Sequence, residues 1–248
     1  MRGYDEASYG DAFADIYDDW YADLTDASAT VARLGRLAGA GPVLELGVGT
    51  GRIAVPLAVA TGVPVFGVDA SEQMLARLSA KPGGDLVTAV LGDMTGTGLP
   101  AGSFTLVYVT YNTFFSILTD ADQRLCCTAV ASRLAPGGRF VIEAFVPVEP
   151  PQQGSVVELR SMAVDRVVLS VSIHDAASQR AEGHLIELTE GNGVRLRPWS
   201  IHYSTPEQLD VMAAEAGLEL ESRVAGWHDE PFDEASTHHV STYRRPTE

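Results

Sequence analysis

Three glycines at alternate positions offer bare backbone to a ligand. Gly47, Gly49 and Gly51 follow the short apolar run Val43–Leu46 and precede a second apolar segment. Glycine has no side chain to keep a ligand away from the backbone N–H groups, and the N-terminus of a following helix adds positive potential. The spacing therefore predicts a strand, a ligand-binding loop and a helix, in that order. A plain tight turn is the alternative interpretation.

The spacing also limits which ligand this loop takes. A dinucleotide fingerprint needs glycine at the sixth position counted from Gly47, where Arg52 stands, and a P-loop needs Lys followed by Ser or Thr after Gly51. Glu45, two residues before the first glycine, is unfavourable beside phosphate and suits a cationic group. S-adenosylmethionine (SAM) meets these conditions because it carries an ammonium and a sulfonium group. Arg52 disfavours the alternative of a nicotinamide-dependent oxidoreductase.

Residues 43–51 resemble the first motif of the class I SAM-dependent methyltransferases. Three later segments extend the resemblance: Asp69 at the end of an apolar run, Gly92-Asp93-Met94, and the turn at residues 134–138. The resemblance implies a doubly wound α/β fold with a seven-stranded, Rossmann-like sheet. It also implies methyl transfer from SAM to an O or N atom of a small molecule, in specialised (natural-product) metabolism.

The resemblance assigns roles to individual acids. Asp69 would accept hydrogen bonds from both ribose hydroxyls, which suits a carboxylate with two oxygens. Asp93 would take the adenine amine, and Met94 would pack on the adenine ring. The alternatives are a helix N-cap region for Asp69 and a turn residue for Asp93. The expected cofactor-binding residues are Tyr17, Tyr21, Glu45, Gly47, Gly49, Gly51, Asp69, Ala70, Met74, Gly92, Asp93, Met94 and Tyr111.

The N-terminal segment is rich in aromatic residues at helical spacing. Tyr17 and Tyr21 are four residues apart and would share one helix face. The segment resembles the Tyr-Asp-x-x-Tyr stretch of bacterial natural-product methyltransferases, including aminosugar N-methyltransferases. In that family such a helix folds over cofactor and substrate. The alternative is an ordinary aromatic helix that packs on the core.

The acceptor should lie beyond the carboxyl ends of the parallel strands. The fourth strand ends near Tyr111, and the fifth ends near Phe145. The expected substrate-binding residues are Asn112, Phe114, Phe145, Trp199, Tyr203 and Trp227. Residues 110–113 lack the proline pair that nucleic-acid amino methyltransferases carry at this strand end, so DNA and RNA are disfavoured as substrates.

A general base is expected only for some acceptors. An amine reacts in its neutral form, whereas a hydroxyl usually needs a base, most often His. The candidates are His202, His228, His238 and His239, of which His228 is preferred because it lies beside Trp227 and Asp229. Glu143 is a second catalytic candidate, as an acid that orients the acceptor. For each histidine a surface or packing role is the alternative. The chain lacks the acid set of magnesium-dependent catechol enzymes, so no metal is expected.

The elements that position these residues follow from the hydrophobic pattern. Apolar strands alternate with helices from residue 42 to 147, which indicates a parallel sheet covered on both faces. Residues 155–203 alternate polar and apolar, which indicates an antiparallel meander. The predicted organisation is a helical cap (1–40), a SAM-binding core (41–147), an antiparallel β insertion acting as a substrate lid (148–204), and a C-terminal part that completes the sheet (205–248).

Composition excludes several classes of function. The chain has 248 residues and a formal net charge of −16, which disfavours nucleic acid and anionic membranes as partners. The adjacent Cys126 and Cys127 match neither a disulfide framework nor a zinc site. We expect a cytoplasmic monomer or homodimer, with a small molecule as its partner. A SAM-binding protein without transfer activity is a further alternative.

Overall fold

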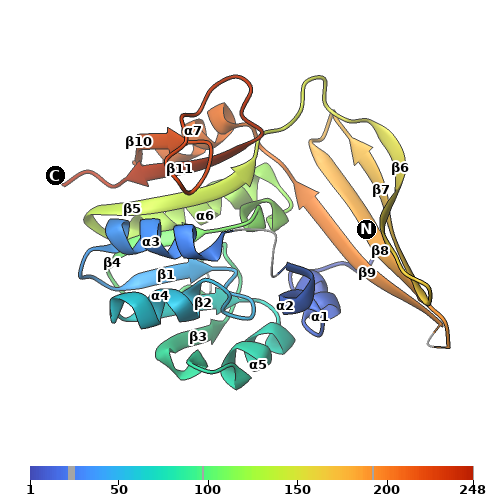
Figure 1. Cartoon of the computed structure of the whole chain (residues 1–248). Helices are drawn as coiled ribbons and strands as arrows, with labels where there is room; N and C mark the ends of the chain where they lie inside the picture. The colour runs from blue at the N-terminus through green and yellow to red at the C-terminus, as the bar shows by residue number, and fades with distance from the viewer. Residues whose placement is uncertain (22–25, 97, 192, 248) are drawn as a thin grey trace.

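Two β-sheets and seven α-helices make up the computed structural model, which describes residues 1–21, 26–96, 98–191 and 193–247 (Figure 1). The larger sheet contains β1 (Val43–Leu46), β2 (Val65–Asp69), β3 (Val87–Leu91), β4 (Phe104–Val109), β5 (Leu134–Phe145), β10 (Glu219–Val224) and β11 (His238–Arg244). The smaller sheet contains β6 (Gly154–Met162), β7 (Arg166–Asp175), β8 (Arg180–Thr189) and β9 (Gly193–His202). The helices are α1 (Ser8–Phe13), α2 (Tyr17–Tyr21), α3 (Ala27–Ala38), α4 (Ala54–Thr61), α5 (Glu72–Ala80), α6 (Asp120–Arg133) and α7 (Pro206–Glu215).

The larger sheet has the strand order β3-β2-β1-β4-β5-β11-β10. Strand β1 pairs in parallel with β2 on one side and with β4 on the other, so Val43 lies opposite both Val65 and Leu106. The chain therefore reverses its direction of travel across the sheet between β3 and β4. In open α/β sheets such a switch point opens a crevice at the carboxyl ends of the strands, here β1 and β4.

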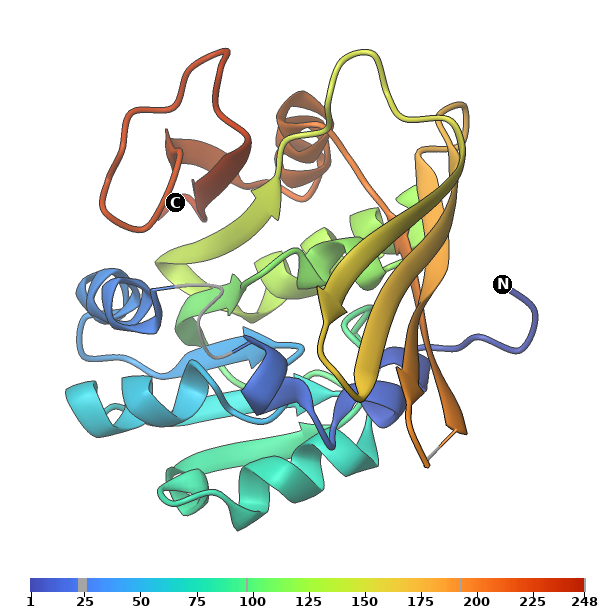
Figure 2. The same ribbon diagram turned by 45° about the vertical axis from the view of Figure 1, so that its right-hand side comes forward.

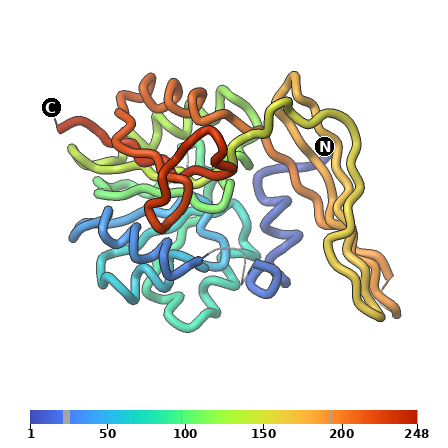
Figure 3. Tube along the Cα trace, turned by 45° about the horizontal axis from the view of Figure 1, so that its top comes forward, coloured from blue at the N-terminus to red at the C-terminus, as the bar shows by residue number. Residues whose placement is uncertain are grey.

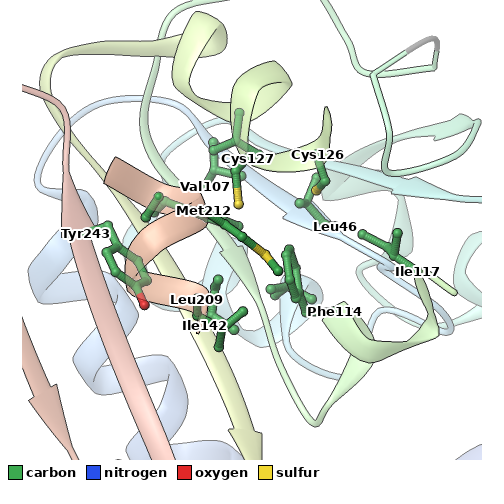
Figure 4. Packing of buried hydrophobic residues seen from close by; sticks show 14 of the residues in the cluster. Leu46, Val107, Phe114, Ile117, Cys126, Cys127, Ile142, Leu209, Met212 and Tyr243 are labelled. Carbon is green, nitrogen blue, oxygen red and sulfur yellow. The ribbon is translucent and has the colours of Figure 1, made fainter. Parts of the chain in front are cut away.

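Alternate residues of the strands bury two separate cores. In β4, Leu106 and Tyr108 pack with the side that α3, α4 and α5 cover, and Val107 and Val109 pack with the side of α6 and α7. The second core includes both free cysteines (Figure 4). The strands therefore have apolar residues on both faces, as the sequence predicts for a covered parallel sheet.

The smaller sheet stands beside the carboxyl edge of the larger one, and α1 and α2 lie between the two (Figures 1 and 2). Its order is β6-β7-β8-β9, and all its pairs are antiparallel. The predicted seven-stranded sheet with an antiparallel insertion is thus confirmed. No helix among the described residues has the length and apolar character needed to cross a membrane.

One strand differs from its predicted start. The sequence predicts β5 from Arg139, after a turn at residues 134–138, but the structure begins it at Leu134, which pairs with Phe104. A register shift between Phe104 and Leu106 absorbs the glycines of this turn, and Gly137 has a φ of 76°. Residues 134–138 therefore belong to β5 and form an irregular part of its pairing with β4.

Candidate functional site

The glycine loop has the backbone geometry that only glycine adopts easily. Gly47, Gly49 and Gly51 have φ values of 66°, 54° and 76°, in the left-handed region. A Cβ on Gly47 would lie 2.4 Å from Cγ2 of Thr113, because the loops after β1 and β4 touch here. Above Gly49 the nearest atom to such a Cβ is Sδ of Met74, at 4.0 Å. Space for a ligand against the backbone therefore remains at the middle glycine.

Asp69 ends β2 and faces this loop. Its Oδ2 accepts a hydrogen bond from Gly49 N at 2.8 Å, and its Oδ1 accepts one from Ser71 N at 2.9 Å. Burial raises the pKa of this carboxyl, although both backbone donors act against the shift. The cap of α5 is Ser71, whose hydroxyl accepts from Met74 N. Asp69 therefore supports the loop directly and does not itself cap the helix.

Glu45 lies beneath the loop and is 3% exposed. Its carboxylate accepts a hydrogen bond from the Tyr108 hydroxyl at 2.8 Å. Burial raises the pKa of Glu45 to about 8, and Tyr108 and the nearby Arg52 oppose the rise. The Arg52 guanidinium lies 5.7 Å from the ring centroid of Tyr111. A buried acid and a cation therefore flank the same end of the crevice.

A cavity of about 300 Å³ opens where β2 and β3 end. It is lined by Asp5, Glu6, Ala7, Ala70, Leu91, Gly92 and Asp93. Oδ1 of Asp93 accepts hydrogen bonds from the backbone N and the hydroxyl of Thr95. The open backbone at Gly49, the Asp69 carboxylate and this cavity lie along one edge, so these residues have the form and the acceptor groups to hold a nucleoside-containing cofactor.

Acidic side chains of the two N-terminal helices make hydrogen bonds and an ion pair with residues along this edge. Asp11 of α1 accepts a hydrogen bond from the Ser71 hydroxyl at 2.6 Å. Asp18 of α2 accepts one from the Thr50 hydroxyl at 2.6 Å and pairs with Lys81 at 2.8 Å. The helical cap is therefore attached to the glycine loop and to α5 through specific polar contacts.

Aromatic rings continue from the cap to the end of β4. The ring centroids of Tyr17 and Tyr21 are 4.7 Å apart, which confirms that the two residues share a face. Tyr21 lies edge-on to Tyr111 at 5.5 Å, and its hydroxyl accepts from the Tyr9 hydroxyl. Met74 is buried against Phe13 in the same cluster. The structure thus brings these predicted cofactor residues together around one end of the crevice.

Glu143 joins the ends of β4 and β5 to the C-terminal loop. Its Oε2 accepts from Tyr111 N, and its Oε1 accepts from Trp227 Nε1, both at 2.7 Å. Asn112 adds a second connection, since Phe145 N donates to its Oδ1. Tyr111 and Asn112 both have positive φ values, of 53° and 63°. One oxygen of Glu143 thus holds the turn with positive φ values in place, and the other oxygen attaches Trp227 of the C-terminal loop to it.

The predicted acceptor residues separate into two groups. The Phe145 and Tyr203 rings lie 6.1 Å apart at the end of β5, and Trp199 shares its strand face with Ile201, which packs nearby. Phe114 instead lies fully buried among Leu46, Ile142 and Met212 (Figure 4). Its ring supports the loop after β4 from within the core.

A second cavity, of about 420 Å³, lies beside the end of β5. It is lined by Val146, Pro147, Glu149, Thr205, Pro206, Glu207, Phe232, Asp233, Glu234 and Ser236. Burial raises the pKa of Tyr203, and the carboxylates of Asp175 and Glu149 raise it further. Thr205 and Pro206 of the lining follow the predicted acceptor residue Tyr203 by two and three residues, so the cavity lies close to Tyr203 along the chain.

The candidate histidines lie in different surroundings. His228 is exposed, and its Nε2 lies 3.2 Å from an oxygen of Asp26 at the N-terminus of α3. His239 is fully buried beside Ser241 on the α7 side of β11, and burial lowers its pKa to about 4. His202 contacts the backbone oxygen of Ser178 at 3.2 Å. None of these contacts involves the glycine loop.

Sequence reasoning missed several residues near the crevice. The sequence pattern indicates for Arg52 only that other cofactors do not fit, and it indicates no role for Asp11 and Asp18. His174 was also missed: its ring contacts the Ser172 hydroxyl at 2.9 Å, and burial lowers its pKa. The sequence pattern predicts that His174 lies in a strand with alternating side chains. It does not indicate which face of that strand turns toward the rest of the protein. Among the described residues no group of three or more His, Cys, Asp or Glu side chains has a metal-binding arrangement.

Comparison with known proteins gives consistent results. A family described as "Methyltransferase domain" matches residues 43–138. The cypemycin N-terminal methyltransferase of a Streptomyces species is 30% identical over 196 residues, which cover 77% of each chain. The structure of the CcbJ methyltransferase from Streptomyces caelestis is 40% identical, with a TM-score of 0.89 over 98% of this chain and 100% of the other. CalS10, an amino pentose methyltransferase from Micromonospora echinaspora, shares the fold at 24% identity, with a TM-score of 0.68 over 93% and 96% of the two chains.

Proposed function

Because the chain belongs to the class I SAM-dependent methyltransferases, we propose that it moves the methyl group of SAM to an amine nitrogen of a small molecule in specialised metabolism. The acidic cavity of about 420 Å³ is the observation that favours an amine as acceptor. Its lining carboxylates would attract a cationic group: Glu149, Glu207, Asp233 and Glu234. The cypemycin relative, an N-terminal methyltransferase, supports the same choice.

The cofactor-binding residues are proposed from the first motif outward. Gly47, Gly49 and Gly51 would present backbone to the amino-acid part of SAM. Asp69 and Ala70 would hold the ribose, the cavity at Gly92 and Asp93 would take the adenine, and Met94 would pack on the adenine ring. Glu45, Met74, Tyr17, Tyr21 and Tyr111 would surround the remaining groups. When bound, SAM supplies a methyl group that is activated by the sulfonium charge.

The acceptor would approach from the ends of β4, β5 and β9. We assign Asn112, Phe145, Trp199, Tyr203 and Trp227 to its surroundings, with residues 148–204 as the lid. Glu143 would act as a positioning residue, because its oxygens hold Tyr111 N and Trp227 Nε1. The catalytic role of His228 stays a prediction of the sequence.

The chain's part in the reaction is to bind, orient and exclude water. The acceptor amine reaches the methyl carbon in its neutral form, and its lone pair forms the new N–C bond as the C–S bond breaks. The proton that the nitrogen then carries leaves to solvent or to a carboxylate. Alignment of the two reactants contributes most of the rate under these conditions. An amine acceptor therefore requires no dedicated base.

The test compares acceptors of different kinds. The purified protein is incubated with SAM and separate panels of amines, phenols and carboxylates, and both S-adenosylhomocysteine and the methylated product are measured by mass spectrometry. We expect products from amines. Methylated phenols or carboxylates alone would overturn the choice of nitrogen.

Calorimetry separates the remaining alternatives. Heat of binding with SAM but no product from any panel would indicate a SAM-binding protein without transfer activity. Binding of NADH in place of SAM would overturn the proposed cofactor site.

A further inference from the structure

The cavity of about 420 Å³ at the end of β5 combines apolar walls with exposed acids. Its apolar lining residues are Val146, Pro147, Pro206 and Phe232. Its acids, all of them exposed, are Glu149, Glu207, Asp233 and Glu234. The ten described residues of the lining include no Lys, Arg or His, so the four carboxylates are not neutralised within it. Such a lining suits an amphipathic cation whose apolar part packs against the walls.

Three segments that are distant in the sequence form this cavity. They are the residues after β5, the start of α7, and the loop between β10 and β11, which runs beside the end of β5 (Figures 1 and 3). Val146 N donates a hydrogen bond to Thr237 O at 2.8 Å, which joins the first segment to the third. Thr205 begins α7 through a capping box with Gln208. Regular secondary structure therefore holds the walls in place.

The acids of the cavity are largely available to a ligand. Within the described part of the chain, Glu149 and Glu234 make no hydrogen bond or ion pair. Oδ1 of Asp233 accepts from Ala235 N at 3.0 Å and from the Ser236 hydroxyl at 3.2 Å, and neither bond involves Oδ2. Most carboxylate oxygens around the cavity are therefore free to accept hydrogen bonds from a cation.

One cation lies beside the cavity wall, but its charge is already balanced. The Arg223 guanidinium lies 5.6 Å from the ring centroid of Phe232, and its Nη2 pairs with Asp210 at 2.5 Å. Its Nε donates to Ser241 Oγ at 2.8 Å. Arg223 therefore leaves the lining acids unpaired. Its contact also shows that the Phe232 ring accommodates a positive charge.

A buried imidazole behind Phe232 has one nitrogen without a partner. His239 is fully buried, and its Nδ1 lies 2.9 Å from Ser241 Oγ. No described residue forms a hydrogen bond with Nε2, on the other edge of the ring. The ring lies edge-on to Phe232, with centroids 6.4 Å apart. When Nδ1–H donates to Ser241, Nε2 presents a lone pair on the side of Phe232, and a buried acceptor without a donor is unfavourable. A ligand N–H group in the cavity would satisfy it.

A cation held in this cavity is not suited to be the reacting nitrogen. Methyl transfer needs a neutral amine with a free lone pair. Nearby carboxylates favour the charged form of an amine and raise its pKa. An ammonium group among four acids therefore keeps its proton. The cavity thus suits a second basic group, which anchors the acceptor without reacting.

We propose that the acceptor carries two basic groups: one nitrogen reacts at the ends of β4 and β5, and the other stays protonated in the acidic cavity, against Phe232 and the carboxylates of Glu207 and Glu234. This inference rests on the proposed function and narrows the acceptor to diamines and other dibasic amines. The two places are neighbours. Asn112 Oδ1 accepts from Phe145 N at 2.6 Å, and the next residue, Val146, lines the cavity. One molecule can therefore extend from one place to the other past Phe145.

The first test measures binding to the full chain without cofactor. The probes are hexylamine, which is protonated at pH 7, and its neutral counterpart hexan-1-ol. NMR spectra of the histidine side chains report binding near His239, whose signals are assigned with a His239→Gln variant. We expect hexylamine to shift these signals and to bind about tenfold more tightly than the alcohol, because hydrogen bonds to charged groups are the stronger ones.

Matched variants locate the binding. The double variant Glu207→Gln with Glu234→Gln keeps the shape of both side chains and removes two charges, so it should abolish the preference for the amine. The control is Glu219→Gln, because Glu219 is an exposed acid of β10 outside the cavity. It should leave the preference unchanged. Circular dichroism shows that each variant is folded.

The second test measures methyl transfer from SAM to 1,6-diaminohexane and to hexylamine. We expect kcat/KM to be about tenfold higher for the diamine, through a lower KM, since the second ammonium group contributes binding that does not change in the transition state. The same double variant should remove this advantage, whereas Glu219→Gln should preserve it.

The outcomes that contradict the proposal are distinct from those that contradict the proposed function. Equal binding of hexylamine and hexan-1-ol, unshifted His239 signals, or a preference for the amine that survives the double variant would overturn the cation site. Equal kcat/KM for the two amines, or no product from either, would overturn the acceptor with two basic groups. Because binding is measured without SAM, the cation site can fail while amines are methylated, and it can be present in a chain that methylates none.

Discussion

Asp69 combines two tasks in one carboxylate. It accepts from Gly49 N and Ser71 N, and it faces the open side of the glycine loop. A carboxylate oxygen has more than one lone pair, so these backbone contacts still leave acceptor capacity for ribose hydroxyls. The same side chain thus shapes the loop and is available to a ligand.

Replacing Asp69 tests this dual role. We expect Asp69→Ala to weaken SAM binding by about 1.5–3 kcal/mol, the range for hydrogen bonds to a charged group. Titration calorimetry measures the change. Asp85→Asn serves as the control, because Asp85 is an exposed acid on the short helix before β3. Equal affinities for the two variants would mean that the acid has been misassigned.

Glu45 should make stability depend on pH. Burial raises its pKa from 4.5 to about 8, so between these values the folded chain holds a proton that the unfolded chain releases. The free energy of unfolding therefore falls as pH rises through this window, by on the order of 5 kcal/mol from this group. Denaturant titrations at several pH values measure it.

The variant Glu45→Gln isolates this contribution. It should flatten the fall in stability, because an amide does not titrate. Burial lowers the pKa of His239 to about 4, which acts in the opposite direction: the unfolded chain takes up a proton as pH falls below 6.5, and stability is lost there. Both proteins contain His239, so its contribution cancels when the free energy of unfolding of Glu45→Gln is subtracted from that of the unaltered chain at each pH. Parallel pH curves for the two proteins would refute the prediction.

At the scale of elements, α1 and α2 lie over the glycine loop and also make polar contacts with it and with the start of α5. Gly10 of α1 packs so closely that a Cβ there would lie 2.4 Å from Cβ of Ser71, next to the Asp11 contact. The predicted aromatic face is present, but the chain divides it between two short helices joined at residues 14–16. Short helices gain most of their stability from packing, so the polar contacts to the loop determine where the cap lies.

The contact between α2 and the glycine loop can be tested with two neighbouring acids. Asp18→Asn removes the charge that holds Thr50 and Lys81. We expect SAM binding to weaken about two- to tenfold, since one hydrogen bond contributes about 0.5–1.5 kcal/mol. The exposed Asp19 provides the control as Asp19→Asn. If both variants bind SAM equally well, the cap contact has no part in cofactor binding.

For the whole molecule, net charge and the acidic cavity act in the same direction. The net charge of −16 attracts cations to the protein. The carboxylates around the cavity at the end of β5 strengthen this attraction near the proposed acceptor site. An amine that is protonated in solution would thus be attracted before it loses its proton.

This attraction predicts a salt dependence. For a cationic amine acceptor, kcat/KM should fall severalfold as sodium chloride increases to about 0.15 M, where charges are screened over about 8 Å. Steady-state kinetics measure it. A neutral acceptor provides the control and should show little change. The same dependence for both acceptors would place the cause outside electrostatic attraction.

The sequence alone determined the central strands, the glycine loop and Asp69, because these depend on apolar periodicity and on backbone conformations that neighbouring residues specify. Along β9, alternation of side chains also places Trp199 and Ile201 on the face opposite His202. Strand alternation is local, so these relations need no knowledge of the fold.

Only the tertiary structure decided which face turns inward and which distant groups meet. Glu143 holds Tyr111 and Trp227 through contacts that span 32 and 84 residues, and no local pattern encodes such a meeting. A shift of one residue in register would exchange the two faces of a strand. The face of the smaller sheet that packs on α1 and α2 through Arg197 is therefore decided by strand pairing and by contacts between distant segments.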